Sequence, residues 1–179
     1  MSKPESGLFK GTSGIDDFYG DAESIIASRV KGLDLSPHPI TQKQLSIKKR
    51  KQIEGKIENR TATKKEYSQY MWTSRFKKRR DKAVKDFWTA EAIRLLDEQK
   101  GTRMWIIEQR KEIIKGDKAT FNNKTLQGHH TYSAAQYPHL ADNHLVIYPA
   151  THYEHIKGWH GGNYKNSQPG KRIRKIREF

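Results

Sequence analysis

Histidine is concentrated in one short part of this sequence. Seven of the eight histidines lie between residues 129 and 160, and His129 and His130 stand side by side in the stretch QGHHTYS. A neutral imidazole is a good ligand for first-row divalent metals, and it is also the side chain best suited to accept a proton near neutral pH. Hydrolysis of a phosphodiester needs both, because a metal neutralises the scissile phosphate while a base deprotonates the attacking water. The histidine pattern therefore indicates metal-dependent phosphodiester chemistry.

Cysteine is absent from the chain. Disulfides and thiolate zinc sites are therefore excluded, and any metal must be held by imidazole, carboxylate, amide or water. No apolar run reaches the roughly 20 residues that would span a bilayer, so we expect no membrane insertion by this segment. The first residues, MSKPESGLFKGTSG, lack the apolar core of a signal peptide, and export would depend on a longer parent chain.

Positive charge is also concentrated. The net charge is +15, and residues 41–86 contribute +11 of it, with 16 Lys and Arg against 5 Asp and Glu. Charge of one sign at this density implies a polyanionic partner, most simply a nucleic acid, with an acidic protein as the alternative. Six basic residues in one cluster are the expected phosphate contacts: Arg75, Lys77, Lys78, Arg79, Arg80 and Lys82.

Helical patterns fill most of the first two thirds of the chain. Residues 16–31 are compatible with a short helix, and the prolines of LSPHPIT separate it from a very basic helix expected over 41–59. The capping-box pattern TKKE opens a helix expected over 63–88. Two shorter helices, each followed by a glycine, are expected over 89–99 and 104–115.

The pattern changes after Gly116. The segment KATFNNKTLQGHHTY carries an Asn-Asn turn signal and indicates a short hairpin or an extended strand. HLVIY (144–148) is a strand candidate that Pro149 would end, and a second capping box at 151–154 starts a helix. The order strand, loop, strand, helix after a helical N-terminal part places the chain in the α+β class.

These motifs resemble a known nuclease group. GHH, DNHLVIYPATHYEH and WHGG are similar to the HNH/endonuclease VII group of the His-Me finger nucleases. More narrowly, residues 127–170 resemble the GHH-type nuclease domains at the C-termini of secreted polymorphic toxins, and the basic helices look like the leader of such domains on LXG-type parents. The resemblance implies a ββα-metal unit, in which a hairpin supplies the first histidine pair and a helix supplies the others.

The resemblance also implies roles for individual residues. His130 would be the general base, and His129 would be a metal ligand. Asn143 or its neighbour His144 would take the place of the group's middle residue, which braces the loop carrying the base: Asn143 matches in residue type and His144 in offset.

The helix would supply the other metal ligands, His155 and His160, for a divalent cation such as Mg²⁺, Mn²⁺, Ni²⁺ or Zn²⁺. The group often spaces these ligands four apart, whereas these two are five apart and diverge by about 140° on a helix of 3.6 residues per turn. Either the helix unwinds before Gly161, or only one of the two ligates, with His152 as the substitute.

Composition and resemblance together divide the chain into four parts. Residues 1–40 are expected to be a linker or accessory segment, partly disordered, and 41–118 a basic helical part. Residues 119–170 would form the ββα-metal catalytic unit, and 171–179 a basic tail.

The function implied is that of a metal-dependent endonuclease toxin that cleaves DNA with little sequence specificity. It would be secreted as part of a larger toxin, act in the cytoplasm of a competing bacterial cell, and be neutralised by an acidic cognate immunity protein in the producing cell. Two alternatives stay open: an RNase toxin on the same scaffold, and a non-catalytic nucleic-acid-binding module with a structural metal. A structural zinc held by histidine alone would be unusual, because such sites favour thiolates.

Overall fold

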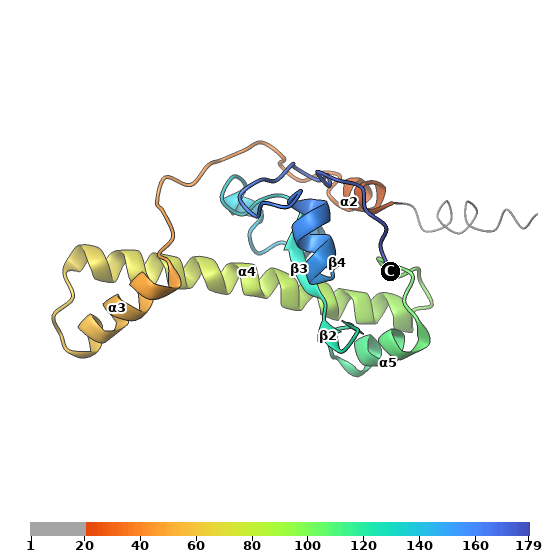
Figure 1. Ribbon diagram of the computed structural model, residues 1–179, viewed down its shortest axis with the longest axis horizontal. Coiled ribbons are helices and arrows are strands. Elements are labelled where there is room, and N and C mark those ends of the chain that lie inside the picture. Colours follow the sequence, from red (N-terminus) through yellow and green to blue (C-terminus); the bar gives the residue numbers. More distant parts are fainter. Residues whose placement is uncertain (1–20) are drawn as a thin grey trace, which may run out of the picture.

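The computed structural model describes residues 21–179, so the first part of the helix predicted over 16–31 and the first half of the linker expected over 1–40 lie outside the described residues. Figure 1 shows one long helix, α4, with a second helix packed against one end and the strands lying over its other half. None of the described helices combines the length and apolar character needed to cross a membrane. The elements in chain order are α2 (Ala22–Arg29), α3 (Ile47–Glu58), α4 (Lys64–Leu96), α5 (Ile107–Lys115), β1 (Thr120–Phe121), β2 (Lys124–Thr125), β3 (Gln127–His130), the 3₁₀ turns η1 (Pro138–Leu140) and η2 (His144–Val146), β4 (Ile147–Ala150) and the π-helical turn η3 (Glu154–Trp159).

Helix α4 is one element of 33 residues where the sequence predicts two. Its predicted start is confirmed, because Thr63 Oγ1 accepts the Glu66 N–H at 3.1 Å and the Glu66 carboxylate accepts the Thr63 N–H at 3.0 Å. The helix continues past residue 88 because Thr89 does not cap a new helix. Its hydroxyl instead donates to the Lys85 carbonyl at 3.2 Å, a bond that a helical threonine can make without breaking the helix.

Helix α3 begins later than the predicted residue 41, because Ser46 supplies the N-cap and accepts the Lys49 N–H at 3.2 Å. It packs against the start of α4, where Lys56 Nζ donates to Glu66 at 2.7 Å. Together these segments form a helical arm (residues 47–75), which projects away from the sheet in Figure 1.

One hydrophobic core joins the helices to the strands. Phe87 from α4, Ile26 from α2, and Ile147 and Tyr148 from β4 are all at most 2% exposed and belong to the same buried cluster. Close contact between α4 and β3 depends on Gly128, because a Cβ at that position would lie 2.8 Å from both methyl groups of Val84. The long helix therefore serves as the platform on which the histidine-bearing strand lies.

Two local predictions about turns are confirmed. Gly116 ends α5 in the left-handed region with φ of 101°, although the helix itself begins at Ile107 and not at 104. Asn122 and Asn123 join β1 to β2, both with positive φ, as a type I′ hairpin turn requires.

The second predicted strand is displaced along the chain. Residues 144–146 form a 3₁₀ turn, and the strand runs from Ile147 to Ala150, so Pro149 lies within the strand and does not end it. Strand β4 pairs antiparallel with β3 alone, which places Pro149 opposite Gly128. Proline is tolerated here because a strand with a single partner has one edge that needs no donor.

The basic tail packs back onto this core. Arg172 pairs with Glu23 of α2 at 2.8 Å, and the Tyr148 hydroxyl donates to Glu178 at 2.8 Å. Phe179 stacks on Phe121 with ring centroids 4.4 Å apart. The tail thereby covers one side of the β3–β4 unit.

Candidate active site

Strand β3 turns its two adjacent histidines to opposite faces, as the alternation of a strand requires. His129 is only 5% exposed and packs against Trp159 of η3, with ring centroids 4.8 Å apart. His130 reaches in the other direction, and its Nε2 lies 2.9 Å from the carbonyl oxygen of Ala141. The pair therefore contributes to two different environments.

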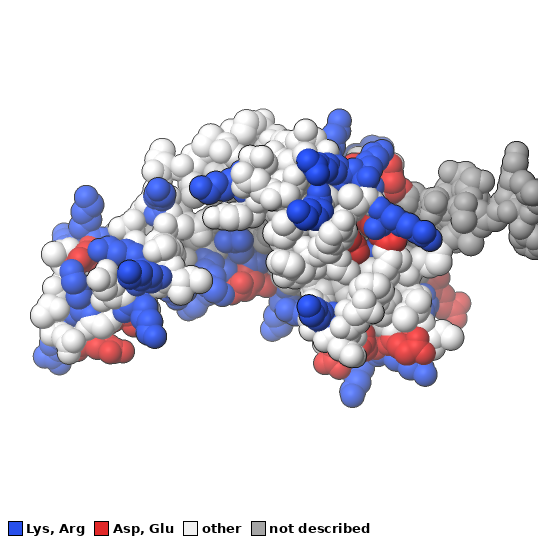
Figure 2. Space-filling model, in the orientation of Figure 1, with Lys and Arg blue, Asp and Glu red and all other residues white. Residues whose placement is uncertain are grey.

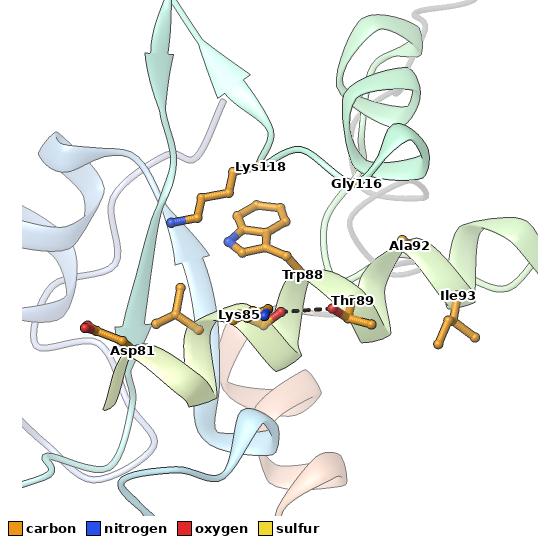
Figure 3. Close-up of a pocket in the computed structure, with 9 residues that line it drawn as sticks. Asp81, Lys85, Trp88, Thr89, Ala92, Ile93, Gly116 and Lys118 are labelled. Carbon is orange, nitrogen blue, oxygen red and sulfur yellow. Dashed lines mark hydrogen bonds between the residues drawn. The ribbon is translucent and has the colours of Figure 1, made fainter. Parts of the chain in front are cut away.

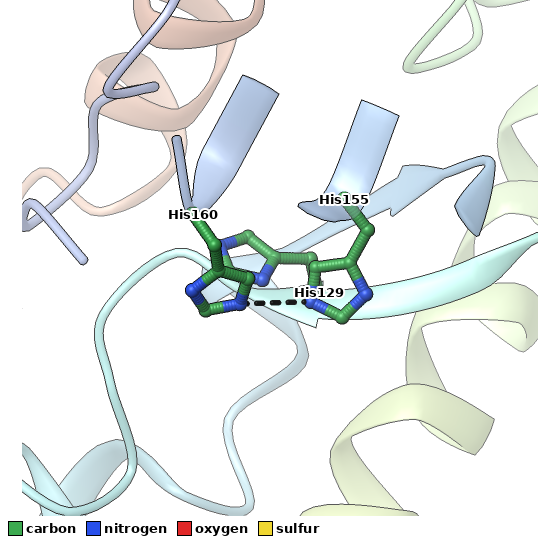
Figure 4. Close-up of side chains that lie close together, drawn as sticks. All are labelled: His129, His155 and His160. Carbon is green, nitrogen blue, oxygen red and sulfur yellow. Dashed lines mark hydrogen bonds between the residues drawn. The ribbon is translucent and has the colours of Figure 1, made fainter. Parts of the chain in front are cut away.

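Three histidines, the His trio, converge on the buried face of β3. The ligating nitrogens of His129, His155 and His160 all lie within 4.8 Å of one another. Figure 4 shows the three rings gathered together, and the Nε2 atoms of His155 and His160 are 3.1 Å apart. Two nitrogens that share a metal at 2.0–2.1 Å lie about 3 Å apart, so this separation suits a common cation.

A π-helical turn accounts for the five-residue spacing. The His160 N–H donates to the His155 carbonyl at 3.1 Å, a bond between residues five apart, within a segment that is π-helical over Glu154–Trp159. Such a turn places residues five apart on one side, whereas an α-helix would separate them. The sequence left open whether both His155 and His160 reach the site or His152 replaces one of them. In the structure both reach the cluster, and His152 lies outside it.

The outer nitrogens of the two helix-borne histidines are held by oxygen atoms. His155 Nδ1 lies 2.6 Å from Gln127 Oε1, and His160 Nδ1 lies 2.6 Å from the Asn166 carbonyl. Since these oxygens only accept, each Nδ1 donates, which leaves a lone pair on each Nε2. Two lone pairs facing each other at 3.1 Å repel unless a cation or a proton lies between them. The His trio therefore fits a divalent metal.

Sequence reasoning missed Gln127 and Asn166. Gln127 lies two residues before His129 on β3, so alternation puts both on one face, and that signal was present in the sequence. Nothing local marks Asn166, which contributes only its backbone carbonyl from a loop beyond η3.

Burial keeps the imidazoles of His129 and His155 neutral. It lowers the pKa of His129 well below the ordinary value and lowers the pKa of His155 to about 4, and in both cases neighbouring histidines add to the effect. Neutral imidazole is the form that ligates a metal.

His130 is also neutral at pH 7. Burial lowers its pKa to about 4, against the opposing effect of the Ala141 carbonyl and with a smaller lowering by Arg80. Because Nε2–H donates to that carbonyl, Nδ1 carries the free lone pair. The carbonyl therefore fixes both the tautomer and the orientation of a ring that can accept a proton.

Ala141 lies in a loop that Asn143 closes. The Asn143 Oδ1 accepts the Leu145 N–H at 2.9 Å, and the Asn143 N–H donates to the Leu140 carbonyl at 3.0 Å. His144 belongs to η2, which packs on α2 and α4, and burial together with nearby Arg94 lowers its pKa. Of the two middle residues left open by the sequence, Asn143 has the contacts of a loop brace.

A buried ion pair anchors the start of the segment that carries His155. The Glu154 N–H donates to Thr151 Oγ1 at 3.1 Å, so half of the predicted capping box is present. The Glu154 carboxylate does not return to Thr151; it accepts from Arg103 at 2.6 and 3.2 Å. Arg103 also donates to the Pro149 carbonyl at 3.1 Å, and thereby ties η3 to β4.

The six basic residues of the cluster lie along α4, and Figure 2 shows Lys and Arg side chains over the helical arm and along this helix. Within residues 21–179, Arg75 and Lys78 are exposed and form no ion pair. Three other members of the cluster form ion pairs: Lys77 with Asp81, Arg79 with Asp142, and Lys82 with Asp86.

Arg80 is the cluster member whose charge acts on His130. Its Nε is buried and has no hydrogen-bond partner in the described part of the chain. The side chain is only half-buried, and a guanidinium beside the candidate base is suited to contact a phosphate.

A hollow of about 650 Å³ lies between α4 and the segment that precedes β1 (Figure 3). Val84 and Trp88 line it, and Lys85 and Lys118 lie at its border. It contains none of the histidines, and Val84 separates it from β3 by packing on Gly128. The hollow is therefore distinct from the histidine cluster.

The antiparallel strands, the helical turn after β4 and the histidines between them define the ββα-metal architecture of the HNH nucleases, and the predicted α+β class is confirmed. Residues 71–151 match a family model described as a GHH signature containing HNH/Endo VII superfamily nuclease toxin, and this part of the chain is similar to that family. The match includes His129, His130 and Asn143 and stops before His155. Comparisons with curated proteins and with solved structures gave no match.

Proposed function

We propose that this nuclease toxin domain is a metal-dependent endonuclease that cleaves DNA with little sequence specificity. One observation carries the proposal: the His trio gathers three ligand nitrogens within 4.8 Å while the adjacent His130 is held by a carbonyl on the other face of the same strand. Residues 119–170 would be the catalytic unit, and 41–118 would be the basic part that binds substrate.

His129, His155 and His160 are the proposed metal ligands. Imidazole suits Zn²⁺ and Ni²⁺, whereas Mg²⁺ and Mn²⁺ prefer oxygen ligands, so Zn²⁺ or Ni²⁺ fits this set better than Mg²⁺ or Mn²⁺. These three histidines would hold the cation, which would supply charge neutralisation for the scissile phosphate and stabilisation for the leaving oxygen.

His130 is the proposed general base. Its Nδ1 takes a proton from the attacking water, and the Ala141 carbonyl keeps the ring in the required tautomer and stabilises the imidazolium that forms. Asn143 supports this arrangement by closing the loop that carries Ala141. Arg80 would bind the phosphate beside the base.

The basic cluster on α4 would hold the nucleic-acid backbone. Lysine and arginine contacts to phosphates carry no sequence information, so cleavage would have little sequence preference. An exposed basic surface also suits an acidic immunity protein in the producing cell, as expected of a toxin that acts in the cytoplasm of a competing cell after secretion on a larger parent.

Incubation of the purified protein with plasmid DNA and with folded RNA tests the proposal, using each of Mg²⁺, Mn²⁺, Ni²⁺ and Zn²⁺ and an EDTA control. We expect nicking and linearisation of the plasmid that EDTA abolishes. Cleavage of the RNA alone would favour an RNase on the same scaffold, and intact substrates under every metal would contradict a nuclease mechanism at this site.

A substitution separates the proposed base from the metal ligands. His130→Ala should reduce cleavage by at least about 100-fold, because general-base catalysis contributes that much, while metal binding and thermal stability stay close to the wild type. His144→Ala is the matched control and should retain activity. Full activity in His130→Ala would reassign the base.

A further inference from the structure

A second group of metal-ligating side chains lies outside the His trio. Asp34, His38 and His139 offer ligand atoms within 4.8 Å of one another. Asp34 and His38 lie in the strap (residues 34–40), which follows α2, and His139 lies 105 residues after Asp34 in the base loop (residues 133–142). Only tertiary folding brings these two segments together.

The distances in this group suit a single cation. His38 Nε2 is 3.0 Å from Asp34 Oδ2, and His139 Nε2 is 2.8 Å from the Asp34 carbonyl and 3.9 Å from Oδ2. Ligand atoms that share one tetrahedral cation at 2.0–2.2 Å lie roughly 3 to 3.5 Å apart, so His139 Nε2 and Asp34 Oδ2 would close by only about half an ångström. Two imidazoles, a carboxylate and a nearby carbonyl therefore have the separations of a coordination sphere.

The strap is fixed in place before any cation binds. Pro37 and Pro39 flank His38 and restrict its backbone, and the His38 N–H donates to the Gln136 carbonyl at 2.8 Å. The Ile40 N–H donates to the Ala135 carbonyl at 2.9 Å. Because the segments are already ordered, binding costs little conformational entropy.

All three side chains remain accessible to an ion from solvent. Asp34 and His38 side chains are each 56% exposed, and that of His139 is 28% exposed. In the metal-free protein, each Nε2–H donates to an oxygen of Asp34, and a cation would replace these two protons.

We propose that Asp34, His38 and His139 form a second metal site, structural in role, for Zn²⁺ or a similar transition-metal ion. Two imidazoles with one carboxylate are a donor set suited to such ions. The bound ion would fasten the strap to the base loop, whose Ala141 lies two residues beyond His139 and holds His130. The site stands on its own geometry and does not depend on nuclease activity.

Metal stoichiometry tests the site. The full chain is dialysed against Zn²⁺ at pH 7.5, and the bound zinc is measured by elemental analysis together with calorimetric titration. We expect about two equivalents in the wild type and about one in Asp34→Asn/His38→Gln. The control His152→Gln removes an exposed histidine outside both groups and should keep two. One equivalent in the wild type, or two in the double variant, would overturn the proposal.

Thermal unfolding gives a second readout in a chain without the His trio. In His155→Gln/His160→Gln, Zn²⁺ at about 100 times the dissociation constant should raise the midpoint by roughly 5 to 10 °C. Adding Asp34→Asn/His38→Gln should remove this rise. A rise that persists in the quadruple variant, or no rise in the first, would count against the site, and circular dichroism confirms that each variant is folded.

Discussion

The two neighbouring histidines His129 and His130 have different proposed roles, because the alternation of one strand turns them to opposite faces. His129 and His130 are adjacent in the chain, yet one packs against Trp159 beside the helix-borne histidines and the other bonds to Ala141. In a neutral imidazole, the nitrogen that donates to an oxygen leaves the other nitrogen with a free lone pair, which can bind a metal or accept a proton. Oxygens on Nδ1 prepare His155 and His160 to ligate, and an oxygen on Nε2 prepares His130 to accept a proton.

Substitution of Gln127 tests whether the oxygen that accepts from His155 Nδ1 orients this ring for metal binding. Gln127→Ala removes the oxygen that orients His155, and we expect the affinity of the His trio for metal to fall by about 10- to 100-fold. Calorimetric titration with Zn²⁺ or Ni²⁺ measures the change, in the Asp34→Asn/His38→Gln background so that one site is observed. Gln127 Nε2 also lies 3.4 Å from His152 Nδ1, a contact outside the His trio. His152→Ala removes this contact alone, so it is the control and should leave the metal affinity unchanged.

Among the elements, the π-helical turn η3 decides whether the proposed metal ligands His155 and His160 meet. Its i to i−5 bond brings His155 and His160 to one side, and the Arg103–Glu154 pair holds its first residue against β4. Such turns are rare and occur often at functional sites. The conformation of this short segment is therefore part of the site.

An insertion and a deletion at exposed Lys157 should have unequal effects. Inserting one alanine after Lys157 spaces the two ligands six apart, off the common side, and should weaken metal binding by about 100-fold or more. Deleting Lys157 spaces them four apart, which an α-helix places on one face, and should weaken binding much less. Calorimetric titration measures both, and equal losses would show that the spacing does not govern the site.

The Glu66 carboxylate stabilises the helical arm, because it accepts hydrogen bonds from Lys56 of α3 and from the Thr63 N–H at the start of α4. Hydrogen bonds from Lys56 and from the Thr63 N–H lower the Glu66 pKa to about 2. A carboxylate whose pKa is lower when folded contributes stability that is complete above its unfolded value of 4.5 and is lost as the pH falls through 4.5 toward 2.

We therefore expect Glu66→Gln to lower the unfolding midpoint at pH 7 and to reduce the loss of stability between pH 4.5 and 2. Thermal unfolding across this range measures both effects. Glu58→Gln, at the exposed end of α3, is the control and should keep the wild-type slope. An unchanged slope in Glu66→Gln would exclude Glu66 as a source of the acid sensitivity.

At the scale of the whole molecule, the long helix α4 connects the most basic part of the chain to the strand that carries His129 and His130. Residues 41–86 hold +11 of the +15 net charge, and they form the arm and the half of α4 that reaches the histidine-bearing strand. Figure 1 shows α4 running from the arm to the sheet, and Figure 2 shows Lys and Arg side chains over the arm and in the region between the arm and the sheet. A polyanion that binds along α4 would be led to the site.

Salt dependence tests this arrangement. In a His130→Ala background that binds without cutting, Arg75→Ala/Lys78→Ala should weaken binding to unrelated DNA sequences about equally and lower the slope of log K against log salt by about 2. Fluorescence anisotropy over a range of salt concentrations measures it. Lys115→Ala, on α5 away from the arm, should leave the slope unchanged. Sequence-dependent losses would contradict backbone binding.

Signals that depend on near neighbours were readable in the sequence. The cap at Thr63 and Glu66, the Asn122-Asn123 turn and the end of α5 at Gly116 are confirmed, because each follows from the conformational preferences of a few adjacent residues. Boundaries were less predictable: α4 continues through Thr89, and β4 contains Pro149, because packing against the rest of the fold outweighs local preference.

The sequence by itself determined the chemical inventory of this protein: imidazoles without thiols, and a positive charge placed before them. It also carried enough of the motif to indicate a GHH-type HNH nuclease toxin. Tertiary structure alone decided which atoms meet, namely the π turn that unites His155 with His160, the Ala141 carbonyl on His130, and the approach of His139 to Asp34. The reason is that these contacts join segments up to 105 residues apart, and the packing of a shared core, which no local pattern records, sets their distances.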